Sequence, residues 1–165
     1  MDDRKRGRSA AQWFCLVIGG TLVLVGLLGF LAEATFDTSA GSDPGALDGE
    51  NFVLLEVNGW HNVVHTLSGA FLLALSGRHR TARTAALAFG AIYAVVTVIG
   101  LIDGHDVLGL IPINPADNVL HILLTVTALA VGLVSDRDRR DVRPATSGRR
   151  FERTSSVEAP TTHRR

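Results

Sequence analysis

Histidine, asparagine and aspartate side chains recur in two short motifs, and these are the residues of the chain best suited to chemistry. Residues 57–67 read V-N-G-W-H-N-V-V-H-T-L, and residues 113–123 read I-N-P-A-D-N-V-L-H-I-L. The shared pattern Asn-x-x-(His/Asp)-Asn-Val-(Val/Leu)-His-x-Leu is an internal repeat. On a helix its polar positions fall at i, i+3, i+4 and i+7, so each copy lines one face with polar groups. These positions are Asn58, His61, Asn62 and His65 in the first copy and Asn114, Asp117, Asn118 and His121 in the second.

Imidazole and carboxylate groups at this spacing are candidate ligands for a metal ion. His61 and His65 stand four residues apart, and Asp117 and His121 repeat the spacing from the second copy. Three imidazoles and one carboxylate form a ligand set for zinc, iron or copper. A variant of this hypothesis makes His65 and His121 the axial ligands of a haem between two helices, because the repeat places them at equal depth.

A structural role accounts for the same residues and is the leading interpretation. Asn58 and Asn114 are predicted N-caps, and Asp117 faces the positive end of its helix dipole. The other four residues are predicted to bond to one another across the two motif helices, as a polar clamp that fixes the register of the helices. The clamp residues are Asn62, His65, Asn118 and His121.

Four long apolar runs must position these motifs. The chain is 47% hydrophobic and 19% charged, and its charges lie almost wholly between the runs. Runs of about 18 to 22 uncharged residues are long enough to cross the ~30 Å hydrocarbon core of a bilayer. The predicted spans are residues 11–32, 58–76, 84–102 and 116–134. We therefore predict an all-α polytopic membrane protein, with four transmembrane helices arranged as two parallel helix-pair repeats.

The distribution of basic residues predicts the orientation of the spans. All sixteen Lys and Arg residues lie in residues 1–10, in the turn 77–84 and in the tail 135–165. By the positive-inside rule these segments are cytoplasmic, and both motif copies lie at the outer face of the membrane. The loop 33–57 holds six acidic residues and no base, and the arginine-rich tail is predicted to be disordered.

Other features limit the alternatives. A cleavable signal peptide is the rival interpretation of the first span, because Ala32-Glu33-Ala34 resembles a small-x-small cleavage site that would leave Thr35 as the mature N-terminus. Cys15 is expected to be a buried thiol, because a single cysteine excludes an internal disulfide. Tyr93 is predicted at a depth close to that of His121, either as an ordinary buried tyrosine or as a member of the polar cluster. No catalytic, phosphate-binding or nucleic-acid motif is present, so no enzyme class is supported.

The segments N-G-W-H-N-V-V-H-T-L-S-G and N-P-A-D-N-V-L-H-I-L resemble the paired motifs of domain-of-unknown-function family 4383, uncharacterised bacterial four-helix membrane proteins. The resemblance covers about residues 19–134. It departs where the second motif has Thr125 in place of the glycine that is Gly69 in the first. The resemblance implies an integral membrane protein without an established activity.

The prediction that follows is a structural or partner-binding protein of the lipid bilayer. It is expected to act as a homo-oligomer or with a membrane partner protein. The alternative is a metal- or haem-binding membrane protein in redox or transport that uses the same cluster.

Overall fold

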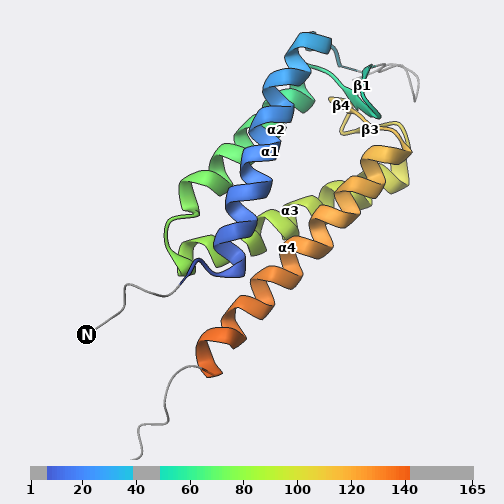
Figure 1. Ribbon diagram of the computed structural model, residues 1–165. Helices are drawn as coiled ribbons and strands as arrows, with labels where there is room; N and C mark the ends of the chain where they lie inside the picture. Colours follow the sequence, from blue (N-terminus) through green and yellow to red (C-terminus); the bar gives the residue numbers. More distant parts are fainter. Residues whose placement is uncertain (1–6, 39–48, 142–165) are drawn as a thin grey trace, which may run out of the picture.

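The computed structural model describes residues 7–38 and 49–141 and consists mainly of four helices (Figure 1). In chain order these are α1 (Ala10–Ala32), α2 (Gly59–Leu75), α3 (His79–Asp103) and α4 (Pro115–Asp141). A β-hairpin joins the helices of each half: β1 (Glu50–Phe52) with β2 (Leu55–Val57), and β3 (Asp106–Val107) with β4 (Ile111–Pro112). Both hairpins lie at the end of the molecule opposite the start of α1.

Three helices of the described chain are long and apolar enough to cross a membrane. They are α1, α3 and the part of α4 from Pro115 to Ser135. The 17-residue α2 spans ~26 Å by helical rise, and its first two turns carry the polar motif. That α2 also crosses the membrane stays a prediction.

Helix boundaries differ from expectation at the basic end of the molecule. The turn predicted at residues 77–84 is shorter, because α3 already begins at His79 and takes Arg80 and Arg83 into its first turns. The last helix continues to Asp141, into the segment that was expected to be tail. The disorder predicted for the rest of the tail lies outside the described residues.

Close backbone packing of α1 on α2 depends on glycine. A Cβ atom placed on Gly19 would lie 2.9 Å from the Gly69 carbonyl oxygen, and one on Gly69 would lie 2.5 Å from that of Gly19. Small residues are the usual means by which helices approach in a bilayer, where apolar side chains gain little by leaving lipid. The second pair packs α3 on α4 at Gly90 and Gly132, against the larger Leu129 and Leu87 side chains.

The buried faces of α1 and α3 share one register. Every buried position of α1 recurs as a buried position of α3 71 residues later. The correspondence pairs Ala11, Phe14, Cys15, Gly19, Leu22, Gly26 and Gly29 with Ala82, Ala85, Ala86, Gly90, Tyr93, Thr97 and Gly100. Cys15 is a free, buried thiol whose Sγ donates to the Ala82 carbonyl at 3.5 Å. It thus joins the two pairs near the basic end.

The hairpins were not expected from the sequence, and their turns show why. Short hairpins are usually recognised by Asn-Gly or Asp-Gly turns, in which both residues tolerate positive φ. Here Val53 and Leu108 adopt φ values of 63° and 59°. These conformations are rare and strained for non-glycine residues. Neither turn therefore carries the sequence signal by which a hairpin is usually recognised.

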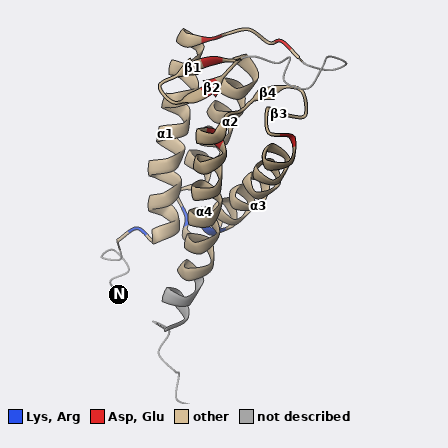
Figure 2. Ribbon diagram, turned by 90° about the vertical axis from the view of Figure 1, so that its right-hand side faces the viewer, with Lys and Arg blue, Asp and Glu red and all other residues tan. Residues whose placement is uncertain are grey.

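Charge is segregated along the molecule (Figure 2). Acidic residues of the described chain gather at the hairpin end, and the described basic residues gather at the opposite end. Within residues 7–38 and 49–135 the acidic set comprises Glu33, Asp37, Glu50, Glu56, Asp103, Asp106 and Asp117, and three further aspartates lie in the last turns of α4. The polar motifs begin at this acidic end, so the candidate site lies beneath the hairpins.

Candidate functional site

Three buried histidines converge beneath the hairpins. His61 and His65 are one turn apart on α2, and His121 comes from α4. One nitrogen from each ring lies within 4.8 Å of the others, and the side chains are only 1%, 2% and 3% exposed. The ring centroid of His61 is 4.4 Å from that of His65 and 6.1 Å from that of His121. We call these three residues the histidine cluster.

Backbone hydrogen bonding orients one ring of the cluster. Nδ1 of His61 lies 2.7 Å from the Glu56 carbonyl oxygen in β2. Because a carbonyl only accepts, Nδ1 carries the proton, and in the neutral ring Nε2 keeps its lone pair. This arrangement, in which one ring nitrogen donates to a carbonyl and the other is left open, is typical of histidines that bind metals.

Several ring nitrogens of the cluster have no hydrogen-bond partner among the described residues. They are Nε2 of His61, both nitrogens of His65 and Nδ1 of His121. The Pro112 backbone also lies close to the His61 ring. A buried polar atom without a partner is unfavourable and is rare in native proteins. The cluster therefore holds unused bonding capacity at the point where three imidazoles meet.

Asp117 lies beside the histidine cluster but serves the backbone. Its Oδ2 accepts hydrogen bonds at 3.0 Å from the Glu56 and Asn114 amides. It is close enough to His121 to interact electrostatically, yet it is not one of the residues whose ligand atoms converge. The structure thus brings together three of the four predicted metal ligands and places the fourth at their edge.

The two N-cap asparagines also join the halves of the molecule. Asn58 Oδ1 accepts from the His61 amide at 2.9 Å, and Asn114 Oδ1 accepts from the Asp117 amide at 3.0 Å. Their side-chain amides reach across: Asn58 donates to the Leu110 carbonyl at 2.8 Å, and Asn114 donates to the Leu54 carbonyl at 3.0 Å. Since 54 and 110 differ by the same 56 residues as 58 and 114, the two bonds are reciprocal.

The remaining motif asparagines bond within their own helix pair. The Asn62 amide donates to the Glu33 carbonyl at the end of α1 at 2.8 Å, and the Asn118 amide donates to the Gly100 carbonyl of α3 at 3.5 Å. Gly29 and Gly100 leave room for these side chains, because a Cβ at either position would meet the asparagine oxygen. Among the described hydrogen bonds, none joins Asn62 or His65 to Asn118 or His121. The cross-pair bonds come instead from the caps and Asp117.

At the end of α1, Glu33 also orders the chain that leaves the helix. Its carboxylate accepts from the Thr35 amide at 2.8 Å. This backbone hydrogen bond holds the pKa of the Glu33 carboxyl below its usual value. Glu33 therefore holds the chain after α1 in two ways: its carbonyl accepts from Asn62, and its carboxylate accepts from Thr35.

Tyr93 borders the histidine cluster on the side of α3. Its ring meets the His121 ring edge to face at 5.5 Å between centroids and stacks on Phe89 at 4.0 Å. The corresponding buried position of α1 is Leu22. An aromatic ring therefore borders the histidine cluster on the side of α3, and α1 has an aliphatic side chain at the equivalent position.

Comparison with known proteins supports the family predicted from the motifs. The model of the family described as Domain of unknown function (DUF4383) matches residues 12–134. The chain belongs to this family. No curated protein and no solved structure matches it. The matched region of the DUF4383 domain contains α1 from residue 12, α2, α3, α4 up to residue 134, both hairpins and the whole histidine cluster.

Sequence reasoning found the polar residues of the DUF4383 domain but missed how they are held. The equal 56-residue spacing of Asn58 with Asn114 and of Leu54 with Leu110 was visible in the sequence. Without knowledge of the hairpins, however, this spacing did not indicate that the asparagines bond to the opposite hairpins. The loop 33–57 was read by its acidic charge, whereas its apolar part forms the hairpin whose Glu56 backbone contacts both His61 and Asp117.

Proposed function

We propose that this protein crosses the bacterial inner membrane four times as two helix-pair repeats related by a pseudo-two-fold axis along the membrane normal. The common register of α1 and α3 and the reciprocal Asn58 and Asn114 bonds support the repeat. The confinement of basic residues to one end supports cytoplasmic termini. Reporter fusions after Gly77 and after Val142 are then expected to report cytoplasm, and a fusion near Gly45 the outside. A cytoplasmic Gly45 fusion would overturn this topology.

We further propose that the histidine cluster binds one transition-metal ion. The observation that carries this proposal is the convergence of three buried imidazoles with nitrogens that lack hydrogen-bond partners among the described residues. Metal–nitrogen bonds of ~2.0–2.1 Å place neighbouring tetrahedral ligands roughly 3.3 Å apart. Ring nitrogens within 4.8 Å reach that spacing by small side-chain rotations.

Three neutral imidazoles favour zinc, copper or iron and leave a coordination position open. Haem fits less well, because its macrocycle would have to lie between His65 and His121. The His61 ring already lies 4.4 Å from the first and 6.1 Å from the second. The open position makes redox or transport roles possible for a bare ion, whereas the buried surroundings exclude bulk water from it.

Metal analysis of the purified protein tests this proposal. We expect about one zinc, copper or iron ion per chain, lost in both His65→Leu and His121→Leu. His105→Leu is the matched control, since His105 is exposed at the same end of the molecule. A metal-free wild type that gains no thermal stability from added Zn²⁺, Cu²⁺ or Fe²⁺ would contradict it, because a ligand that binds only the folded state must stabilise that state.

A structural or partner-binding role is the second candidate, and one observation favours it. The hairpin tips expose apolar side chains: Val53, Leu54 and Leu108 are 83%, 72% and 73% exposed. Together with the strained Val53 and Leu108 backbones, this indicates a contact surface for a second copy or a membrane partner protein. Val53→Ser with Leu54→Ser is expected to reduce cross-linked oligomers or complexes in native membranes while leaving the metal content unchanged. Cross-linking that is unchanged in this variant would remove the candidate.

A further inference from the structure

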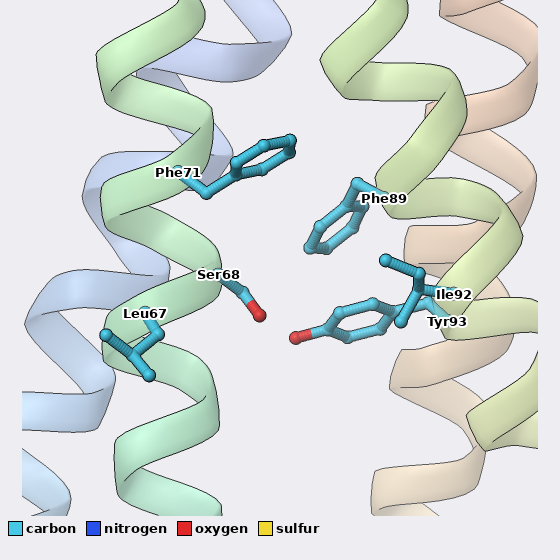
Figure 3. A pocket seen from close by; sticks show the side chains of 6 residues that line it. All are labelled: Leu67, Ser68, Phe71, Phe89, Ile92 and Tyr93. Carbon is cyan, nitrogen blue, oxygen red and sulfur yellow. The ribbon is translucent and has the colours of Figure 1, made fainter.

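A pocket of about 250 Å³ opens between α2 and α3, which are neighbours in the chain but belong to different helix pairs (Figure 3). Its outer edge consists of the exposed side chains of Leu67, Phe71 and Ile92, and its floor of the buried Phe89 and Tyr93 rings. The pocket therefore runs from the lipid-facing surface toward the interior. Its volume is below the ~300 to 1,000 Å³ of pockets that enclose a whole drug-sized ligand. It suits a single ring whose substituents extend outward.

Two hydroxyl groups stand in this otherwise apolar pocket. The Ser68 and Tyr93 hydroxyls point toward each other across it. Ser68 is near enough to interact with the Tyr93 hydroxyl, which is buried and has no other hydrogen-bond partner among the described residues. In a bilayer, where water is absent, such a hydroxyl strongly favours an acceptor. An occupant that supplies an acceptor oxygen between Ser68 and Tyr93 is therefore stabilised.

The depth of the hydroxyls restricts what that acceptor can be. Tyr93 lies ten residues before the end of α3, and Ser68 lies nine residues after the start of α2. At ~1.5 Å per residue both are ~14 to 15 Å from the hairpin end, which is near the middle of a ~30 Å hydrocarbon core. Phospholipid carbonyls remain at the edges of that core, and acyl chains carry no acceptor. The acceptor must belong to a molecule whose polar atoms enter the membrane interior.

We propose that this pocket binds the ring of a membrane-soluble quinone. The carbonyl oxygen accepts from the Tyr93 and Ser68 hydroxyls, and the flat ring lies against Phe71 and the Phe89–Tyr93 stack. The tail leaves past Leu67 and Ile92 into the lipid. Because Tyr93 also meets His121 edge to face, a bound quinone lies one side chain away from the histidine cluster. Quinone binding does not depend on the cluster holding a metal.

Binding can be measured with the protein in phosphatidylcholine nanodiscs, with a decyl-substituted benzoquinone as the probe. Retention by protein-containing discs in excess of empty discs is expected to saturate at one quinone per chain. Tyr93→Phe keeps the ring and removes the hydroxyl, so the Kd should rise about three- to tenfold, as expected for one lost hydrogen bond. Ser68→Ala should raise it by a smaller factor. Thr21→Val, which removes an exposed hydroxyl from α1, is the matched control and should leave the Kd unchanged.

Decylbenzene separates a quinone from a plain hydrocarbon occupant, because it has the same tail and a ring without carbonyls. It should fail to displace the quinone at equal concentration. Equal displacement would overturn the proposal and make the pocket a lipid-chain groove. A non-saturable wild type, or a folded Tyr93→Phe protein with unchanged Kd, would overturn it as well. Thermal unfolding of each variant establishes that it is folded, and metal content measured on the same samples keeps failure here distinct from failure of the metal site.

Discussion

The two halves of the molecule share the residues that hold its backbone and differ at residues around the histidine cluster. Asn58 and Asn114 make equivalent caps and equivalent cross-pair bonds. His61, in contrast, corresponds to Asp117. In the proposed repeat, the shared residues form the scaffold, and the residues that differ between the halves carry the candidate chemistry.

The hairpins give a physical reason for the divergence at this position. Asp117 accepts from the Glu56 amide of the opposite hairpin. The residue equivalent to Glu56 is Pro112, which has no amide hydrogen to donate. A carboxylate at position 61 would therefore lack this donor, and the structure has instead a histidine there that donates to Glu56. The difference between the equivalent residues His61 and Asp117 is thus explained by the difference between the equivalent residues Glu56 and Pro112.

Exchanging the small residue at the helix contact should have the largest effect. Gly69 corresponds to Thr125, so Gly69→Thr gives the first half the residue of the second. Its Cβ would press on the Gly19 carbonyl, and overpacking of this kind costs ~1–3 kcal/mol or prevents folding. Thr125→Gly should cost less, since Thr125 is only partly buried. Thermal unfolding in detergent measures both changes, and an equal loss would contradict the packing described for Gly19 and Gly69.

Converting His61 into its counterpart should abolish the metal site. His61→Asp removes one imidazole and buries a carboxylate opposite Pro112, so the bound metal should be lost and the free energy of unfolding should fall by ~1–3 kcal/mol. Asp117→Asn should retain the metal, because Asp117 is outside the converging ligand set. Metal analysis and unfolding distinguish the two. Metal retained in His61→Asp with unchanged imidazole ligation would mean that the ion is bound elsewhere.

Removing either of the cross-pair hydrogen bonds made by Asn58 and Asn114 should lower the free energy of unfolding by a smaller amount, equal in the two halves. Asn58→Ser and Asn114→Ser keep a capping oxygen and remove the amide that donates to Leu110 or Leu54. Each should reduce the free energy of unfolding by about 1 kcal/mol, the net value of one hydrogen bond. Asn→Ala at either position also removes the cap and should cost more. Clearly unequal losses for the two serine variants would argue against the pseudo-two-fold arrangement.

The sequence allowed the four helices, the family and the polar faces to be predicted, because hydrophobic run length and the Asn/His spacing are local signals. It could not show the hairpins, whose strands of two or three residues are too short for a period and whose turns use Val53 and Leu108 at positive φ. Without the hairpins, the sequence assigned the cross-pair bonds to Asn62, His65, Asn118 and His121. The Asn62 and Asn118 amides reach the Glu33 and Gly100 carbonyls in their own helix pairs.

The convergence of three histidines was only partly predictable. His61 and His65 share a helix face by their spacing, but the approach of His121 depends on how the two pairs pack. The separation of Asp117 from the ligand set could not be foreseen, because its donors are the backbone amides of Glu56 and Asn114. Local periodicity thus identified the candidates, and the tertiary structure selected among them.

X-ray absorption at the edge of the bound metal tests the central claim most directly. The site described here predicts one ion per chain with about three imidazole nitrogens at ~2.0–2.1 Å. The imidazole scattering should fall by about one ligand in any variant of His61, His65 or His121 that still retains metal. Protein that holds no ion after purification and metal loading, or an ion without imidazole ligands, would contradict the assignment of the histidine cluster as a metal site.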